Sequence, residues 1–210
     1  LLSATVRVEC SEPELYAVVA EVAAPKLAYG APGACYVVLE RNAEQPIVPA
    51  TFTCELKFNV VELDPATGEP DGDDEGFPED YPLEDLELGT ADFMAKTSLG
   101  DFRRAWEEVG GDDEVQEKFA LQFKRLDEAV SAIIDFLGMQ PCEGTHALGG
   151  GSGGKAPTSH HLLLSGVFVG NIPVLVRAQL VLDKSSGVVL KIAVRSKDPG
   201  VSQMVADCIR

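Results

Sequence analysis

Apolar and polar residues alternate in short runs along the N-terminal part of the chain, which is the pattern of half-buried β-strands. In the longest run, Thr51 to Val61, the apolar positions are Phe52, Cys54, Leu56 and Phe58. Shorter runs of the same kind occupy Thr5 to Glu9, Tyr16 to Val22 and Cys35 to Leu39. Turn-rich spacers such as Ala31 to Gly33 separate these runs, so the pattern predicts an all-β region folded as a sandwich.

An acidic stretch follows these strands. Glu62 to Glu87 holds twelve acidic residues, and no Lys or Arg occurs between Phe58 and Ala95. Self-repulsion and the Pro and Gly content predict an exposed, mobile acidic loop near residues 62–82. The loop approaches EF-hand spacing at Asp71, Asp73, Glu75 and Gly76. However, Pro82 stands where calcium requires a bidentate carboxylate, so we expect no calcium site.

The periodicity changes after Asp92 to a mixture of helix and strand. Asp101 can cap, and Gly110 can end, a helix with the apolar stripe Phe102, Ala105, Trp106 and Val109. A second stripe, Leu126 to Leu137, ends at Gly138, and Pro199 begins a last helix. Strands are predicted at Lys118 to Phe123, His161 to Val169, Val174 to Leu182 and Val188 to Arg195. We therefore expect two subdomains, an all-β sandwich over residues 1–91, closed by a strand at Leu86 and Leu88, and an α+β unit with an antiparallel sheet and flanking helices over residues 92–210.

Trp106 is the only tryptophan in the chain. One interpretation places it in the core, because large aromatic side chains are mostly buried. The other makes it a ligand anchor, because tryptophan is enriched among residues that contribute most to binding energy. The helix is short, and Phe102 and Val109 suffice to hold it down. We therefore expect a partly exposed Trp106 ring that serves as a binding anchor, flanked by basic side chains of a neighbouring hairpin.

The last two predicted strands place their basic residues on one face. Val174 to Leu182 has apolar residues at its even positions, whereas Arg177 and Gln179 face the other way. In the following strand, Lys191 and Arg195 likewise oppose the apolar set. If the strands pair as a hairpin, these four residues form one outward patch. The patch is either a solvated sheet face or a shallow platform for an acidic peptide beside Trp106.

The overall charge narrows the classes of partner. The chain has 34 acidic and 17 basic residues, a net charge of −17, which argues against binding to nucleic acid or to an anionic membrane surface. No apolar run is long enough to span a bilayer, and the N-terminus alternates like a strand, so we expect a cytosolic protein. Five widely spaced cysteines without a Cys-x-x-Cys pair predict reduced thiols and no zinc site.

Candidate catalytic motifs are incomplete. Gly149 to Lys155 approaches a phosphate-binding loop, but Ala156 stands at the metal-binding Ser or Thr position and Pro157 disrupts the helix that should follow. We interpret the run as a flexible linker. His160 and His161 point to opposite faces of one predicted strand, so they do not form a metal pair. We therefore predict no enzyme, no cofactor and no metal, with a nucleotide-binding enzyme as the alternative.

Longer motifs resemble the appendage (ear) domain of the gamma subunit of coatomer, the COPI vesicle coat. They include Phe-x-x-x-Trp-x-Glu-Val-Gly at Phe102 to Gly110, Phe-Leu-Gly-Met at Phe136 to Met139 and Leu-Leu-Leu-x-Gly-Val-Phe at Leu162 to Phe168. Pro-Gly-x-Cys-Tyr at Pro32 to Tyr36, Asp-Pro-x-Thr-Gly-Glu at Asp64 to Glu69 and Leu-Glu-Asp-Leu-Glu at Leu83 to Glu87 continue the likeness over the whole chain. The family sandwich has further strands before the one that Thr5 to Glu9 resembles. Two interpretations stay open: the sequence is trimmed before this strand, or the sandwich itself lacks its first strands.

The resemblance implies an immunoglobulin-like sandwich followed by a platform subdomain. It also implies a non-enzymatic module that recruits accessory proteins, such as an Arf GTPase-activating protein, for Golgi to ER and intra-Golgi transport. The other coatomer subunits would be partners through the parent gamma subunit, and the location would be cytoplasmic, on Golgi membranes and coated vesicles. In the family the partner site surrounds residues that match Trp106, Arg177 and Arg195. A clathrin-adaptor-like ear that binds other peptide motifs, and a module that only fills the coat, remain alternatives.

Overall fold

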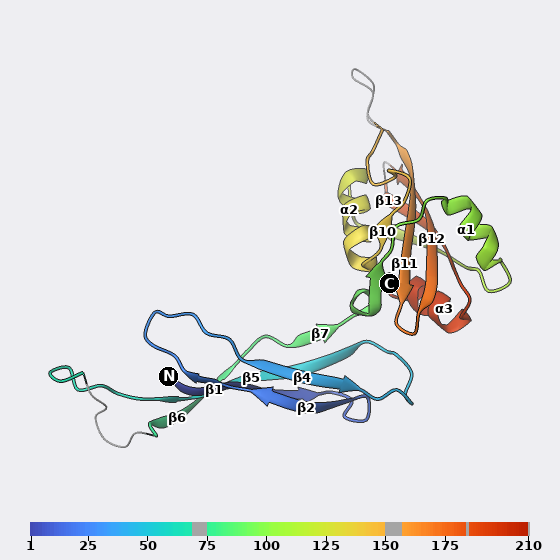
Figure 1. The fold of residues 1–210 in the computed structure, drawn as a ribbon. Coiled ribbons are helices and arrows are strands. Elements are labelled where there is room, and N and C mark those ends of the chain that lie inside the picture. The colour runs from blue at the N-terminus through green and yellow to red at the C-terminus, as the bar shows by residue number, and fades with distance from the viewer. Residues whose placement is uncertain (69–74, 150–156, 184, 210) are drawn as a thin grey trace. The chain divides into compact units, whose positions relative to one another are not determined.

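The fold is taken from a computed structural model that describes residues 1–68, 75–149, 157–183 and 185–209. The chain divides into two compact units, Leu1–Leu88 and Gly89–Arg210 (Figure 1). The first is built from strands alone and the second combines strands with helices. The predicted order of an all-β sandwich followed by an α+β platform is confirmed.

The first unit consists of two facing antiparallel sheets. Its strands are β1 (Leu2–Cys10), β2 (Tyr16–Val22), β3 (Ala24–Lys26), β4 (Tyr36–Arg41), β5 (Ala50–Val60), β6 (Phe77–Pro82) and β7 (Leu86–Leu88). One sheet has the order β3-β1-β5-β6, with β7 also paired to β5, and the other is β2-β4. The core between them centres on Phe52, whose ring meets the Tyr16 ring edge-on with a centroid distance of 5.2 Å. Val37 and Leu39 of β4 pack on the same cluster, which closes the sandwich.

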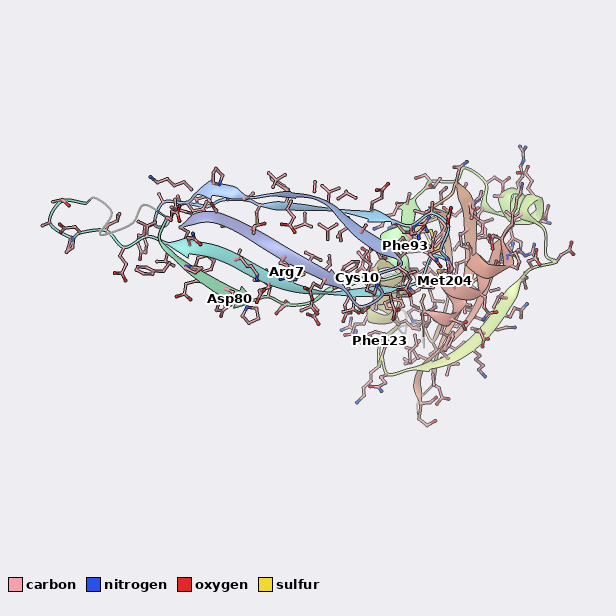
Figure 2. The ribbon with its side chains drawn as sticks, turned by 90° about the horizontal axis from the view of Figure 1, so that it is seen from below. Arg7, Cys10, Asp80, Phe93, Phe123 and Met204 are labelled. Carbon is pink, nitrogen blue, oxygen red and sulfur yellow. The ribbon has the colours of Figure 1, made fainter. Side chains whose placement is uncertain are left out.

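The predicted acidic loop near residues 62–82 is wrong in its last part, where the chain forms β6. This strand pairs with β5 from Val60↔Phe77 to Glu55↔Pro82. All β6 side chains are exposed, including Asp80 in Figure 2, so the charge pattern was compatible with a loop. Main-chain hydrogen bonds to β5 form the strand, and its prolines and carboxylates suit a sheet edge. Asp71 and Asp73 of the EF-hand spacing, and most of the glycine-rich run, lie outside the described residues.

The second unit is a single antiparallel sheet with helices on both faces. Its elements are η1 (Thr90–Phe93), β8 (Met94–Lys96), α1 (Phe102–Val109), β9 (Val115–Leu121), α2 (Leu126–Leu137), β10 (Gln140–Pro141), β11 (Ser159–Phe168), β12 (Ile172–Asp183), β13 (Gly187–Ser196) and α3 (Pro199–Asp207). The sheet order is β10-β11-β12-β13-β9, and β8 also pairs with β11. Near the start of the unit, the Phe93 ring lies 6.1 Å from that of Phe168 (Figure 2).

The residues that were predicted to begin or end helices do so in the structure. The Arg104 amide donates a 2.9 Å hydrogen bond to Asp101 Oδ1, which caps α1. Gly138 ends α2 with φ at +62°, a left-handed conformation that favours glycine. At α3, Asp198 accepts hydrogen bonds from the amides of the first turn after Pro199. The three predicted helices are therefore confirmed, with Asp101, Gly110 and Gly138 at their ends and Pro199 at the start of α3. The cap at Asp198 was not predicted.

The two faces of the sheet have different environments. Even-numbered residues of the long strands are almost all buried, and they form the main core. Figure 1 shows α1 and α2 on opposite sides of the sheet, and the Ser202 hydroxyl of α3 bonds to Ser196 on the even-numbered face. The odd-numbered face carries α1 over part of its area only. The remainder of that face, across β9, β13 and β12, is open and polar, and it positions the candidate site.

Candidate partner-binding site

Helix α1 attaches to the odd-numbered face of the sheet through its aromatic side chains. Phe102 and Trp106 form a buried cluster with Cys142 and Leu175, and Leu163 and Ala193 of the sheet pack against it. The Phe102 and Trp106 rings stack at a centroid distance of 5.7 Å and an interplanar angle of 26°. The spacing of four residues brings the two rings onto one side of the helix. The cluster therefore fixes α1 beside the open part of the sheet.

The expectation of a partly exposed Trp106 ring is wrong, because the side chain is only 3% exposed. Two guanidinium groups cover the indole: the Cζ atom of Arg177 lies 4.1 Å from the ring centroid and that of Arg195 lies 4.4 Å away. Cation–π attraction favours both contacts. The sequence placed these arginines on the correct face, but it could not show that they would lie over the ring.

Arg195 is held in place by the protein itself. Its Nε atom donates a 2.6 Å hydrogen bond to Glu114 Oε2, and its Nη1 atom donates to the main-chain oxygen of Trp106 at 2.9 Å. The side chains of Arg195 and Glu114 are only 20% and 16% exposed. Arg195 lies on β13, Glu114 directly precedes β9, and Trp106 belongs to α1. The Arg195 side chain therefore connects these three elements.

The neighbours of Glu114 change the pKa of its carboxyl group. Burial alone would raise its pKa, but hydrogen bonds from Gln116 and Arg195, with the charges of Arg195 and Arg177, lower the pKa below its ordinary value of 4.5. Glu114 therefore stays ionised in the folded protein, and its charge compensates that of Arg195.

Arg177 differs from Arg195 in its contacts. Within the described part of the chain, its guanidinium has no ion pair or hydrogen bond and meets only the rings of Trp106 and Phe102. Burial, followed by the charge of Arg195, lowers the pKa of Arg177 from its ordinary value of 12.5. The group remains a cation at neutral pH, because a guanidinium does not lose its proton in a protein near neutrality. Arg177 thus presents unused hydrogen-bond donors above an aromatic surface.

All five residues singled out from the sequence line one surface hollow of about 360 Å³: Trp106, Arg177, Gln179, Lys191 and Arg195. Strands β12 and β13 pair as expected, with Arg177↔Ala193 and Gln179↔Lys191 in register. Glu114 and Gln116 of this hollow were not predicted, because the strand was expected to begin at Lys118, whereas β9 begins at Val115. Val115 has the same parity as the apolar Phe119 and Leu121, and this period of two could have extended the strand back to Val115 and placed Gln116 on the face of Lys118. The charged Glu117 interrupts that apolar series.

The histidines occupy separate environments, as predicted. His160 Nε2 lies 2.6 Å from the carbonyl oxygen of Thr145, whereas His161 lines the hollow on the opposite face of β11. Among the described residues there is no group of three or more His, Cys, Asp or Glu side chains that could hold a metal ion. In the same part of the chain, no helix is both long and apolar enough to cross a membrane.

The buried contacts of Arg195 predict that its removal destabilises the fold. We expect Arg195→Ala to lower the free energy of unfolding by about 1 to 3 kcal/mol, because it leaves the part-buried Glu114 carboxylate without its cation and uncovers Trp106. Denaturant unfolding at neutral pH measures this change. A variant as stable as the wild type would contradict the structural role of Arg195.

The same ion pair predicts a dependence on pH. Because the folded-state pKa of Glu114 is lowered, its contribution to stability is present above the unfolded-state value of about 4.5 and is lost as the pH falls further, through the folded-state pKa. We expect Glu114→Gln to reduce the pH dependence of unfolding in that acidic window relative to the wild type.

Comparisons with known proteins cover the whole chain. The family model described as the coatomer subunit gamma-1 C-terminal appendage platform matches residues 91–209. The model described as the coatomer gamma subunit appendage platform subdomain matches residues 1–89.

Curated relatives give the same picture. Coatomer subunit gamma of Arabidopsis thaliana is 40% identical over 203 residues, which is 96% of this chain and 22% of that protein. Coatomer subunit gamma-2 of Bos taurus is 44% identical over 199 residues, or 92% of this chain and 21% of the relative. The chain therefore spans about a fifth of the length of these relatives.

Proposed function

The chain belongs to the coatomer gamma-subunit appendage family, and on this premise we propose that it is a non-enzymatic protein-interaction module of the COPI vesicle coat. It recruits accessory proteins, among them an Arf GTPase-activating protein, for transport from the Golgi to the ER and within the Golgi. The rest of coatomer is reached through the parent gamma subunit. The module works on the cytoplasmic side of Golgi membranes and coated vesicles, without inserting into the bilayer.

The observation that supports this proposal is the hollow beside helix α1. Arg177 offers a guanidinium without an ion pair among the described residues. It lies over the buried Trp106 ring, next to an apolar floor formed by the half-buried Leu163 and Ala193. A carboxylate can accept two parallel hydrogen bonds from such a guanidinium. An apolar side chain adjacent to the carboxylate can pack on the floor. The hollow therefore fits a short peptide that combines an acidic residue with an apolar one.

Each predicted site residue has a role in this proposal. Trp106 lies beneath the two guanidinium groups and supports them, Arg195 holds helix α1 in place through the Trp106 main-chain oxygen, and Arg177 receives the carboxylate of the partner. Gln179 and Lys191 line the adjoining wall of the hollow and offer an amide and an ammonium group to the peptide. All of these contacts are reversible, as expected of a coat that must assemble and disassemble.

Calorimetric titration of the full chain with a purified Arf GTPase-activating protein tests the proposal. We expect saturable binding in the micromolar range that weakens with added salt, because an acidic segment meets a basic hollow. Titration with ATP and with GTP should give no saturable heat. Absence of binding to the purified protein would contradict the proposed partner, and saturable nucleotide binding would favour the enzyme alternative.

A further inference from the structure

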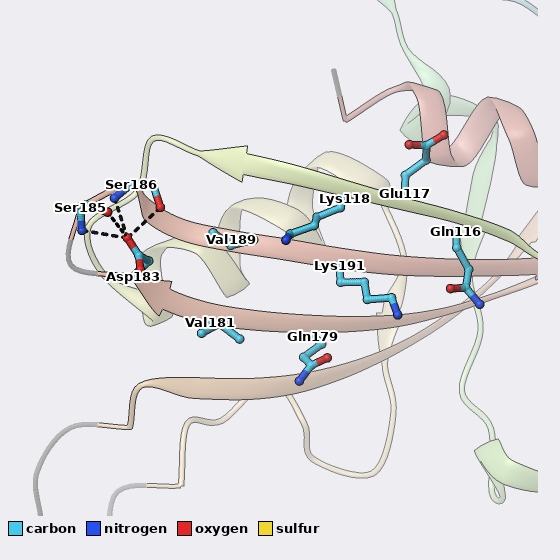
Figure 3. Close-up of a pocket in the computed structure, with 10 residues that line it drawn as sticks. All are labelled: Gln116, Glu117, Lys118, Gln179, Val181, Asp183, Ser185, Ser186, Val189 and Lys191. Atoms are coloured by element: carbon cyan, nitrogen blue, oxygen red, sulfur yellow. Dashed lines mark hydrogen bonds between the residues drawn. The ribbon is translucent and has the colours of Figure 1, made fainter.

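The open face of the sheet continues beyond the Trp106 hollow. A second hollow of about 990 Å³ extends over β9, β12 and β13 towards the turn at Ser185 and Ser186 (Figure 3). It shares Gln116, Gln179 and Lys191 with the Trp106 hollow. The two hollows are therefore adjoining parts of one surface. We call the second part the lysine groove, because Lys118 and Lys191 line it.

The two lysines stand directly opposite each other. Lys191 of β13 is in register with Lys118 of β9. Like charges in directly opposed positions of neighbouring strands destabilise a sheet. Neither lysine has an ion pair within the described residues, and each is exposed. In a chain with 34 acidic and only 17 basic residues, an uncompensated pair of cations is an unfavourable feature of the folded protein that an anionic ligand would relieve.

The carboxylates nearest to the groove do not neutralise this pair. Asp183 accepts hydrogen bonds from the amides and hydroxyls of Ser185 and Ser186, at 2.5 to 2.9 Å (Figure 3). These bonds hold the pKa of Asp183 well below its ordinary range. In Figure 3, Glu117 projects to the opposite side of β9 from Lys118, as expected of consecutive residues in a strand. Asp183 and Glu117 also line the hollow, but neither forms an ion pair with Lys118 or Lys191 within the described residues.

We propose that the lysine groove is a second subsite, which binds carboxylates of an extended acidic peptide whose apolar residue lies at the Trp106 hollow. This inference rests on the proposed function, since the same peptide occupies both hollows. Lys118 and Lys191 bind its acidic side chains, and the Gln179 amide lies between them and Arg177, where it can bond to the peptide main chain. The partner is an unstructured acidic segment of an accessory protein, with its carboxylates on one side of the apolar residue. A chain of net charge −17 attracts an anion only at a local basic surface such as this one.

Selection from a library of displayed random peptides tests which residue types the two hollows recognise and how those residues are arranged along the peptide. The 210-residue wild-type chain should enrich peptides that carry an apolar residue with acidic residues on one side of it. The doubly substituted Lys118→Glu/Lys191→Glu chain should retain the apolar preference and lose the acidic one. The matched control, Lys96→Glu/Lys124→Glu, carries the same change in charge at exposed lysines that line neither hollow, and it should select as the wild type does.

The affinity of one selected peptide gives the second readout. We expect Lys118→Glu/Lys191→Glu to weaken binding by about tenfold or more at low ionic strength, with a smaller difference at high salt. The single variant Lys118→Glu should also raise the Tm by roughly 1 to 3 °C, because it places opposite charges across the strands. A structural role alone would change the Tm and leave the affinity unchanged.

The outcomes separate this inference from the proposed function. Equal acidic enrichment by the wild type and by Lys118→Glu/Lys191→Glu, or equal affinity for the selected peptide, overturns the second subsite and leaves the Trp106 hollow intact. Selection by Arg177→Gln of the same peptides as the wild type overturns the proposed function, whatever the lysine variants do. A library that yields no enriched peptide with the wild type contradicts both.

Discussion

Trp106→Ala is expected to lower the free energy of unfolding of the second unit by about 3 to 5 kcal/mol. The indole is only 3% exposed, stacks on Phe102 and supports the guanidinium groups of Arg177 and Arg195. Its removal leaves a cavity between α1 and the sheet, and the remaining side chains can fill it only in part. Circular dichroism during denaturant unfolding measures the change, because the variant has no tryptophan left for fluorescence.

Trp106→Phe is the matched control for this experiment. It retains an aromatic ring that can stack on Phe102 and lie under the arginines, so we expect a loss of roughly 1 to 2 kcal/mol. If Trp106→Ala unfolds at the same denaturant concentration as the wild type, the indole does not contribute to the core as the structure indicates. Because the alanine variant changes the fold itself, a loss of binding in that variant would not locate the partner.

Arg177→Gln should separate binding from folding. We expect it to weaken binding of a purified Arf GTPase-activating protein by about 10- to 100-fold, since a charge-assisted hydrogen bond contributes roughly 1.5 to 3 kcal/mol. Stability should change little. The substitution loses a cation–π contact with Trp106, but it also removes the repulsion between Arg177 and Arg195.

The control for Arg177→Gln changes the charge elsewhere on the same unit. Arg125 lies at the start of α2, on the opposite side of the sheet from α1, where it pairs with Asp127. Arg125→Gln should bind the partner as the wild type does. Equal affinity of Arg177→Gln and wild type, measured by calorimetry at low ionic strength, would show that Arg177 does not bind the partner.

The sequence predicted those parts of the unit that depend on local chemistry. The caps of α1 at Asp101 and of α2 at Gly138 follow from neighbouring residues. The shared face of Arg177, Gln179, Lys191 and Arg195 follows from the alternation along two strands joined by a short turn. Each of these inferences needs only a few adjacent residues and one pairing.

The sequence could not predict contacts between distant segments. Arg195 and Glu114 are 81 positions apart, and their ion pair depends on how β9 docks beside β13. The burial of Trp106 has the same cause, because Arg177 and Arg195 cover the ring only after the sheet has formed. At β6, the exposed acidic side chains gave no sign of the main-chain bonds to β5. The opposition of Lys118 and Lys191 likewise required the register of two strands.

The most direct test of the account uses the single tryptophan as a reporter. In a nitrogen–proton correlation spectrum of the isotopically labelled chain, Trp106 alone gives an indole signal. Titration with an unlabelled, purified Arf GTPase-activating protein should shift or broaden this signal in a saturable manner, because the partner binds over the Arg177 guanidinium that covers the ring. An indole signal that stays unchanged while other signals shift would place the partner elsewhere and contradict the account.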